Sequence, residues 1–349
     1  MIISTPSRFL LRCGWAALAL LHPGGFRPAC AQVQAPAAGL WDAHAHLSLY
    51  GAAALDSLVA HGVVAVRDLG GDLETTLRWR AEIAEGRRRG PTIYTAGVIL
   101  DGPKEGATPR WTLRTPAEAE AAVDSLAGRQ VDFIKTHNAL APAVYFAVLR
   151  RARLRGLRVA THLPRGVPAW VAADSGVGSI EHAAESLLAS PIYAGYAGSA
   201  EEAMDWWRSA AGDSALRRLA RTGVSVTPTL AAYAANVDRP AEAEARLARR
   251  GVLTFLVELT RRMYLAGITL MAGSDLALPG GPIRPGASLL EELAWLRRAG
   301  LPEAAVRDAA SRNLARWLGR TPRPDSGMGR PPLVLLRDQA LRGRPGHGG

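Results

Sequence analysis

The feature that most constrains the fold of this chain is a regular alternation of short apolar segments with longer amphipathic ones. The apolar or β-branched segments predict strands, and they occupy residues 40–47, 62–69, 92–100, 131–137, 157–163, 178–182, 224–230 and 268–275. Helical periodicity predicts helices between them, at residues 73–85, 116–127, 142–155, 214–222, 245–266 and 289–299. This repetition over roughly 260 residues favours an α/β fold of the TIM-type (β/α)8 barrel class over a doubly wound open sheet.

Local signals support the predicted helix ends. Thr115 and Glu118 flank Pro116 in a capping box, and helices are expected to end at glycines such as Gly156 and Gly223. No G-x-G-x-x-G sequence or P-loop opens a predicted helix, so nothing indicates a nucleotide site. With 48% hydrophobic and 21% charged residues, the composition is that of a globular protein, which excludes disorder and a disulfide-stapled miniprotein.

The first 31 residues predict a secretory signal that is removed from the mature chain. Arg8 and Arg12 precede a nine-residue apolar run at 13–21, and Ala29-Cys30-Ala31 has the small-x-small pattern of a signal peptidase site. The alternative is a permanent membrane helix, which needs about 20 apolar residues. Both cysteines, Cys13 and Cys30, lie in this segment. We therefore expect a periplasmic or secreted protein without a stable membrane anchor, and any metal site must use His, Asp, Glu or a modified Lys.

The formal charge of +11 comes from arginines spread along the chain. The longest basic run is the triplet at 87–89, and no aromatic residues are interleaved with a basic run. Basicity of this kind gives little support for nucleic acid binding, so we expect a small-molecule substrate and no nucleic-acid partner. Homo-oligomerisation stays open.

Polar residues able to bind metal stand where the predicted strands end. They are His44 and His46 on the first strand, Lys135 on the fourth, His162 on the fifth, His182 on the sixth and Asp275 on the eighth. The carboxyl ends of barrel strands open at one mouth, and residues i and i+2 of a strand share a face, so these side chains should converge. Imidazole and carboxylate suit a divalent cation such as Zn²⁺. Because a lone strand-end histidine is most often a packed one, the prediction depends on the joint placement.

Lys135 carries a separate argument from composition. Only two of the 42 basic residues are lysines, so something at position 135 selects against arginine. A buried amine can lose its proton and react with CO₂ to give a carbamate that bridges two metals, whereas a guanidinium stays protonated. The alternative is an ordinary buried lysine paired with a carboxylate. Lys104, the other lysine, follows the third strand and either meets a substrate carboxylate or is solvated.

Five motifs in order resemble the amidohydrolase superfamily. They are WDAHAHL at 41–47, GVVAVRDLGG at 62–71, DFIK at 132–135, SIEH at 179–182 and AGSD at 272–275. The resemblance runs from about residue 40 to Gly319 and is greatest to the imidazolonepropionase-like and prolidase-like metal-dependent hydrolases. Asn313, within AASRNLA at 309–315, fits the closing helix of that family.

The resemblance implies an enzyme with two divalent ions, zinc being the expected metal. It implies His44 and His46 on one ion, His162 and His182 on the other, Lys135 as a carbamylated bridge, and Asp275 as ligand and proton acceptor. Two such ions lower the pKa of water towards ~7 and polarise a carbonyl, and a carboxylate can pass the proton to the leaving amine. The expected reaction is therefore hydrolysis of an amide-like C–N bond in a small cyclic amide or peptide.

The chain also departs from the family pattern. Relatives build a small β-sandwich from segments on both sides of the barrel, but only residues 32–40 precede the first strand after cleavage. The tail at 320–349 is rich in Pro, Gly and Arg and holds one strand-like run, at 332–336. We therefore divide the chain into a signal peptide at 1–31, a barrel at 32–319 and this tail, and expect a missing or vestigial sandwich.

Three further residues are candidates for substrate contact. His137 lies two residues after Lys135 and so faces the same side of the strand, Lys104 lies in a strand-end loop, and Tyr233 follows the seventh strand. Two other functions stay open. The same barrel and metals can hydrolyse esters, lactones or phosphotriesters, and a barrel that has lost catalysis can serve as a secreted binding module.

Overall fold

The computed structural model describes residues 39–104, 109–237, 242–277 and 279–320. The predicted signal segment with both cysteines, and the tail with its strand-like run at 332–336, lie outside the described residues, as do residues 32–38. The expected cleavage and the missing or vestigial sandwich therefore stay predictions.

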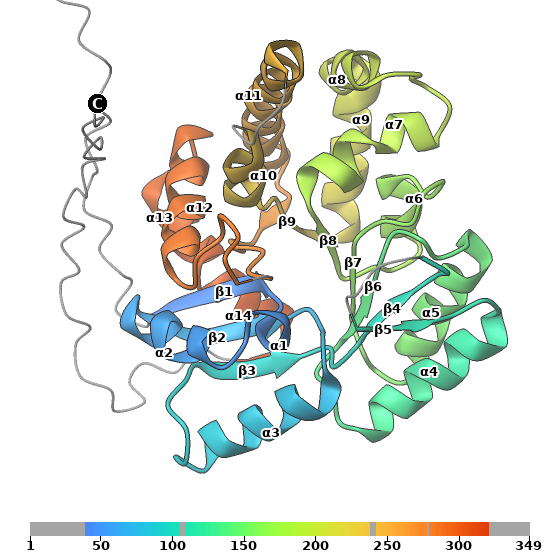
Figure 1. Cartoon of the computed structure of the whole chain (residues 1–349). Coiled ribbons are helices and arrows are strands. Elements are labelled where there is room, and N and C mark those ends of the chain that lie inside the picture. Colours follow the sequence, from blue (N-terminus) through green and yellow to red (C-terminus); the bar gives the residue numbers. More distant parts are fainter. Residues whose placement is uncertain (1–38, 105–108, 238–241, 278, 321–349) are drawn as a thin grey trace, which may run out of the picture. The chain divides into compact units, whose positions relative to one another are not determined.

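Ten strands form two parallel sheets in the part of the chain described (Figure 1). The smaller sheet has the order β1 (Leu40–Ala45), β2 (Val63–Asp68), β3 (Thr92–Thr95). The larger sheet has the order β10 (Thr269–Leu270), β9 (Ser225–Thr227), β8 (Ser179–Glu181), β7 (Val159–Thr161), β6 (Ile134–Thr136), β4 (Ile99–Asp101), β5 (Arg110–Thr112). Parallel sheets are covered on both faces, which explains why these segments are apolar runs without strict alternation.

Backbone hydrogen bonds join the two sheets at both edges of the smaller one. On the β1 side, the amide of Ala43 donates to Ala272, and the amide of His46 donates to Leu276, at 2.8 and 2.6 Å. On the β3 side, the amide of Asp132 donates to the carbonyl of Thr95 at 2.9 Å. The predicted neighbourhood of the first and eighth strand segments is thus present.

Fourteen α-helices and one π-helical turn connect or follow the strands within the described residues (Figure 1). The first seven are α1 (Leu47–Tyr50), α2 (Ala53–Ala60), α3 (Leu73–Ala84), α4 (Pro116–Gly128), α5 (Pro142–Leu154), α6 (Ala169–Asp174) and α7 (Ser190–Tyr193). The others are α8 (Ala200–Arg208), α9 (Ala210–Thr222), α10 (Leu230–Val237), α11 (Ala243–Leu265), α12 (Ala287–Arg298), α13 (Glu303–Ala309) and α14 (Arg312–Trp317), with the π-helix η1 at Ala183–Leu188. None of the described helices is long and apolar enough to cross a bilayer.

The structure confirms the α/β class and corrects three predicted strands. The strand expected at 92–100 is two strands, β3 and β4, because the chain bends at Gly97, whose φ of +76° suits glycine. The strand expected at 224–230 ends at Thr227, and Leu230 already begins α10. The eighth segment pairs over Thr269–Leu270 only, so Asp275 lies in the irregular segment that follows β10.

The predicted capping box is present at the start of α4. The Thr115 hydroxyl accepts from the amide of Glu118, and the Glu118 carboxylate accepts from the amide of Arg114, one residue before the cap. Gly223 adopts the left-handed conformation after α9, as expected of a helix-ending glycine.

The part of the core nearest the candidate site is built from β1, β2, β6 and α14. Trp41, Phe133, Met271 and Trp317 belong to one buried cluster, and the rings of Phe133 and Trp317 meet edge to face at 5.4 Å. The helix predicted near Asn313 therefore brings Trp317 under the ends of β1 and β2. This packing gives the strand ends a rigid base.

Candidate metal centre and active site

Three predicted site residues form a compact group of metal-type ligands. One ligand atom from each of His44, His182 and Asp275 lies within 4.8 Å of the other two. His44 Nε2 is 3.3 Å from Asp275 Oδ1, and His182 Nδ1 is 4.0 Å from Asp275 Oδ2. The rings of His44 and His182 are 4.6 Å apart. Strand ends thus bring together side chains from residues 44, 182 and 275.

His46 and His162 extend this group on either side. His46 Nε2 lies 4.0 Å from Asp275 Oδ1, and its ring is 5.3 Å from that of His44. The ring of His162 is 4.9 Å from that of His182. The four predicted imidazoles therefore follow one another in a continuous series, as the joint placement at strand ends predicts.

Hydrogen bonds fix how two of the rings face the group. The Nδ1 of His46 lies 2.7 Å from the carbonyl oxygen of Gly70, which can only accept, so this nitrogen carries the hydrogen and Nε2 keeps a lone pair towards Asp275. His182 Nδ1 is 3.0 Å from the Thr229 hydroxyl, which can donate or accept. Ring orientation at this site is therefore set by neighbours outside the group.

Lys135 is fully buried in the middle of β6. Its neighbours across the sheet are Ile99 and Ala160, and its amine Nζ has no hydrogen-bond partner among the described residues. Burial lowers the pKa of Lys135 to about 8, so its amine loses a proton far more easily than an exposed lysine does. The ordinary alternative, a buried lysine paired with a carboxylate, is not what the described residues show.

The protonation states suit a set of metal ligands. Burial lowers the pKa of His46 to about 4 and holds the pKa values of His44, His162 and His182 well below the ordinary range, with neighbouring cationic groups adding to the effect. All four imidazoles are therefore neutral near pH 7. Burial also raises the pKa of Asp275 to about 7. Neutral imidazole is the form that binds divalent metal.

A divalent cation fits these residues on the evidence of their unpartnered atoms. His44 Nε2, His162 Nδ1 and Lys135 Nζ are buried, and none finds a hydrogen-bond partner in the described part of the chain. Buried polar atoms are paired as a rule, so three such atoms at neighbouring strand ends indicate a missing partner of positive charge or a modification. His44 Nε2 also lies 3.3 Å from Asp275 Oδ1 without a hydrogen bond to it, which likewise indicates a missing cation.

Comparison with known proteins was made at three levels. No protein-family model and no curated protein matches the chain. Among solved structures, a bottromycin amidohydrolase matches with a TM-score of 0.66 and 25% sequence identity, covering 82% of this chain and 68% of that one. This match is to the same superfamily that the five ordered motifs resemble. The shared fold and the ordered motifs together support the amidohydrolase superfamily and its prolidase-like branch.

Two prolidase-type structures share the fold of this chain. A Xaa-Pro dipeptidase with bound methionine matches with a TM-score of 0.59 and 19% identity, covering 80% of this chain and 75% of that one. A prolidase complexed with N-methylphosphonate-L-proline matches with a TM-score of 0.61 and 17% identity, covering 80% and 74%. At these identities the two structures support the fold alone.

Sequence reasoning missed a buried ion pair beside His44, one of the candidate metal ligands. Arg67 on β2 and Glu181 on β8 are both fully buried and lie 2.7 Å apart between Nη2 and Oε1. Glu181 Oε2 is also 3.0 Å from His44 Nδ1. Burial, the largest single influence, would raise the pKa of Glu181, but Arg67, Lys135 and the hydrogen bonds from Ser179 and Thr227 together outweigh it and lower the pKa, so the carboxylate is ionised. The available signal in the sequence was a charged residue inside a predicted strand, because charged residues are almost never fully buried without a partner.

A second buried carboxylate holds the segment that carries Asp275. Asp42 on β1 accepts from the amide and the hydroxyl of Ser274, at 3.0 and 2.6 Å. Gly273 lies so close to β1 that an added Cβ would be 2.6 Å from the Cβ of His44. The glycine of the AGSD motif therefore allows close contact with β1, and the serine of the motif supplies the groups that donate to Asp42.

Strained backbone conformations occur at the candidate metal centre. His182, Thr229 and Asp275 have φ values of 63°, 53° and 56°, and only one other described non-glycine residue has positive φ. The π-helix η1 begins directly after His182. Positive φ is unusual for a β-branched residue such as Thr229, and π-helical turns occur often at functional sites. These features come from tertiary packing and could not be seen in the sequence.

A cavity of about 410 Å³ opens beside two of the candidate metal ligands. Its lining includes His182 and Asp275 together with Glu185, Tyr233 and Arg249. A volume of this size suits a small ligand. Tyr233, predicted as a substrate contact, is therefore placed at the cavity next to Asp275.

The other two predicted substrate residues lie on the side of β4 and β6. His137 Nδ1 is 3.3 Å from Asp101 Oδ2, and the ring of His137 is 4.5 Å from that of His162. Lys104 is exposed and donates from Nζ to Asn138 Oδ1 at 3.2 Å. Neither belongs to the lining of the cavity beside Asp275. Their roles stay predictions.

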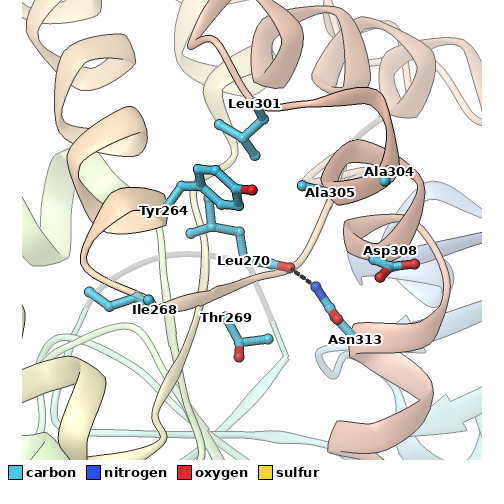
Figure 2. A pocket seen from close by; sticks show the side chains of 10 residues that line it. Tyr264, Ile268, Thr269, Leu270, Leu301, Ala304, Ala305, Asp308 and Asn313 are labelled. Atoms are coloured by element: carbon cyan, nitrogen blue, oxygen red, sulfur yellow. Dashed lines mark hydrogen bonds between the residues drawn. The ribbon is translucent and has the colours of Figure 1, made fainter.

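A second cavity, of about 360 Å³, lies where β10 begins (Figure 2). Figure 2 shows Tyr264, Leu301 and Asp308 around it, with the Asn313 side chain donating to the carbonyl oxygen of Leu270 at 2.9 Å. No predicted site residue lines it. Asn313, which fits the closing helix of the family, has a structural contact here.

Proposed function

We propose that this amidohydrolase hydrolyses an amide-like C–N bond in a small cyclic amide or peptide. The observation that carries the proposal is the compact group of His44, His182 and Asp275, the last two of which line a cavity. The buried, unpartnered atoms His44 Nε2, His162 Nδ1 and Lys135 Nζ add to it. A bottromycin amidohydrolase shares the fold at 25% identity, which supports the same reaction class.

Two divalent ions, with zinc the expected metal, fit the donor set. His44 and His46 would hold one ion and His162 and His182 the other, with Lys135 as a carbamylated bridge and Asp275 as a further ligand. When bound, such ions polarise a carbonyl and lower the pKa of water towards ~7. The neutral state of the four imidazoles supports this assignment, since only neutral imidazole offers a lone pair.

Asp275 is proposed to move the proton. Its side chain is 29% exposed towards the cavity, so it can reach both a water and a bound substrate. Its carboxylate would take the proton from the attacking water and deliver it to the leaving nitrogen, which must be protonated to depart. In the metal-free protein burial raises the pKa of this carboxyl group to about 7, and a bound cation would lower that pKa, which favours the ionised, proton-accepting form at neutral pH.

Hydrolysis of a defined panel tests the proposal. The zinc-loaded mature protein is incubated with dipeptides, cyclic dipeptides, lactones, carboxylic esters and a phosphotriester, and each is repeated after removal of metal by chelation. We expect turnover of an amide that is lost on chelation and restored by zinc. Preferred turnover of a lactone, ester or phosphotriester would assign the alternative hydrolase, and binding without turnover would assign the inactive binding module.

We also propose that the two sheets form one closed (β/α)8 barrel, with β3 and β4 sharing a single strand position. The hydrogen bonds at both edges of the smaller sheet, from Ala43 and His46 on one side and from Asp132 on the other, support closure. A crystal structure with either of these edges open contradicts it.

Export is proposed from the N-terminal sequence, with cleavage near Ala31. The supporting features are Arg8 and Arg12, the short apolar run at 13–21 and the small-x-small pattern at 29–31. N-terminal sequencing of the protein purified from its native host tests the cleavage, and a mature chain that begins at Met1 contradicts it.

A further inference from the structure

The carboxylate of Glu181 stands between a buried arginine and a proposed metal ligand. Its Oε1 accepts from Arg67 Nη2 at 2.7 Å and from the Ser179 hydroxyl at 2.6 Å. Its Oε2 accepts from Arg67 Nη2 at 2.8 Å and lies 3.0 Å from His44 Nδ1. These side chains have no exposed surface, so water does not compete for any of these bonds.

Arg67 is itself held on every side. Its Nε donates to the carbonyl oxygen of Ala43 at 2.6 Å, and its Nη1 donates to the Ser179 hydroxyl at 2.8 Å. Its Nη2 reaches Thr227 Oγ1 at 3.1 Å, and its guanidinium carbon lies 4.6 Å from the ring centre of Trp317. The guanidinium therefore has one available position, and it fixes the rotation of the Glu181 carboxylate.

The bond to Glu181 decides which nitrogen of His44 carries hydrogen. An ionised carboxylate only accepts, so His44 Nδ1 must donate. A neutral imidazole has one N–H, which leaves the lone pair on Nε2. Nε2 is the nitrogen that is buried, unpartnered in the described residues and 3.3 Å from Asp275 Oδ1.

We propose that Glu181, held by Arg67, is a positioning residue that fixes the tautomer and ring orientation of His44 for metal binding. This inference rests on the proposed function, because it assigns Glu181 to the same metal centre. His46 obtains the equivalent bond from the backbone of Gly70, which no substitution of a side chain removes. His44 depends on a side chain, so its positioning can be changed by one substitution.

The substitution Glu181→Gln tests this tautomer directly. The amide oxygen of the glutamine would accept from Arg67 and Ser179, which turns its NH₂ group towards His44 Nδ1. That nitrogen must then accept, so the hydrogen moves to Nε2 and blocks the lone pair. Loss of such an outer hydrogen bond costs metal affinity roughly 10–100-fold.

Glu292→Gln is the matched control. Glu292 on α12 is also a fully buried carboxyl group, and it accepts from the amide of Ala231 at 2.7 Å without contacting a proposed metal ligand. Zinc dissociation constants are measured by chelator competition for the wild type and both variants. We expect weaker zinc binding in Glu181→Gln and wild-type binding in Glu292→Gln.

Nitrogen-15 NMR of the metal-free wild type gives a readout that needs no folded variant of Glu181. The His44 signals are assigned by their absence in His44→Asn, and we expect a protonated Nδ1 and an unprotonated Nε2. Hydrogen on Nε2 in the wild type, or zinc affinity within threefold of wild type in a folded Glu181→Gln, would overturn the positioning role. A wild type that binds no zinc would instead overturn the proposed function itself.

Discussion

The two cavities of this protein are similar in volume and different in chemistry. The cavity beside Asp275 holds about 410 Å³, and the one beside Asn313 holds about 360 Å³. In the second cavity Asn313 donates to the backbone of Leu270, and Asp308 lies 3.2 Å from Arg312. In the first, Asp275 lies 3.3 Å from His44 Nε2, a buried atom with no hydrogen-bond partner among the described residues.

The two cavities also differ in the backbone strain of the residues that line them. His182, Thr229 and Asp275 all line the first cavity with positive φ, whereas the residues with positive φ around the second include Gly267 alone among those described. Glycine adopts this conformation at little cost, and the other three do not. The comparison teaches that unsatisfied ligand atoms and strain identify the site, while volume does not.

Exchanging one carboxylate for its amide in each cavity is the strongest test of this difference. Asp275→Asn keeps the shape but removes the basic oxygen, so hydrolysis should fall ~10²-fold or more while the fold remains. Asp308→Asn should leave the rate unchanged, because Asp308 makes only a surface ion pair. Rates are measured with circular dichroism as the check on folding. An Asp275→Asn rate above about a tenth of wild type contradicts the assigned role.

Substitutions of Lys135 are expected to have the next largest effect on activity. Lys135→Arg should lose bound metal and activity together, although charge and length are nearly kept, because a guanidinium cannot form a carbamate. Lys135→Ala should be partly rescued by a small carboxylic acid in excess, which can enter the vacated space. Metal content and activity are measured side by side, and Lys104→Arg, at the only other lysine, should keep its metal.

An ordinary structural lysine predicts the opposite order for the same variants. Arginine would then be tolerated better than alanine, and no added acid would help. Full metal occupancy and activity in Lys135→Arg would rule out the bridging role.

The pH dependence of stability gives a further test, through the buried carboxyl group of Glu292. Burial raises the pKa of Glu292 to about 8, so the folded state keeps a proton that the unfolded state releases above about pH 4.5. Its contribution to stability is therefore full below pH 4.5 and is lost as the pH rises towards 8, by on the order of 4 kcal/mol. Glu292→Gln should flatten this part of the stability profile measured by urea unfolding. An unchanged slope would mean that Glu292 is ionised in the folded protein.

Substitution of Arg249 is expected to have the smallest effect, on KM alone. Arg249 is the one cationic side chain among the described residues that line the first cavity, apart from histidine, and its Nη1 donates a long hydrogen bond of 3.4 Å to the carbonyl oxygen of Asn236. Arg249→Gln should raise KM about tenfold for substrates with a carboxylate and leave neutral ones unchanged, as expected for a lost charged hydrogen bond. Equal changes for both substrate types would show that Arg249 does not select for charge.

The periodic parts of the fold and the strand-end histidines could be predicted from the sequence. Helices α3, α4 and α5 lie within a residue or two of their predicted bounds, because their apolar spacing is set by local geometry. The convergence of His44 and His182 follows from strand order alone. Gly97 could not be recognised as a bend, since its left-handed conformation depends on how two sheets meet.

The supporting contacts around the site could not be predicted. Arg67 and Glu181 are 114 positions apart in the sequence, and nothing local shows that a charged residue on β2 faces one on β8. The left-handed Thr229 and the turn at η1 also depend on packing between distant elements. Sequence spacing thus indicated which side chains converge, and the structure shows which contacts hold them.

The metal content of the mature protein tests the central claim most directly. The purified chain is equilibrated with zinc, passed through a desalting column and analysed for metal per chain by plasma mass spectrometry, with Asp308→Asn as the control for the second cavity. The proposed assignment of His44 and His46 to one ion, and of His162 and His182 to a second, predicts two ions per chain in both proteins. Zinc-equilibrated protein that retains no metal would contradict the account.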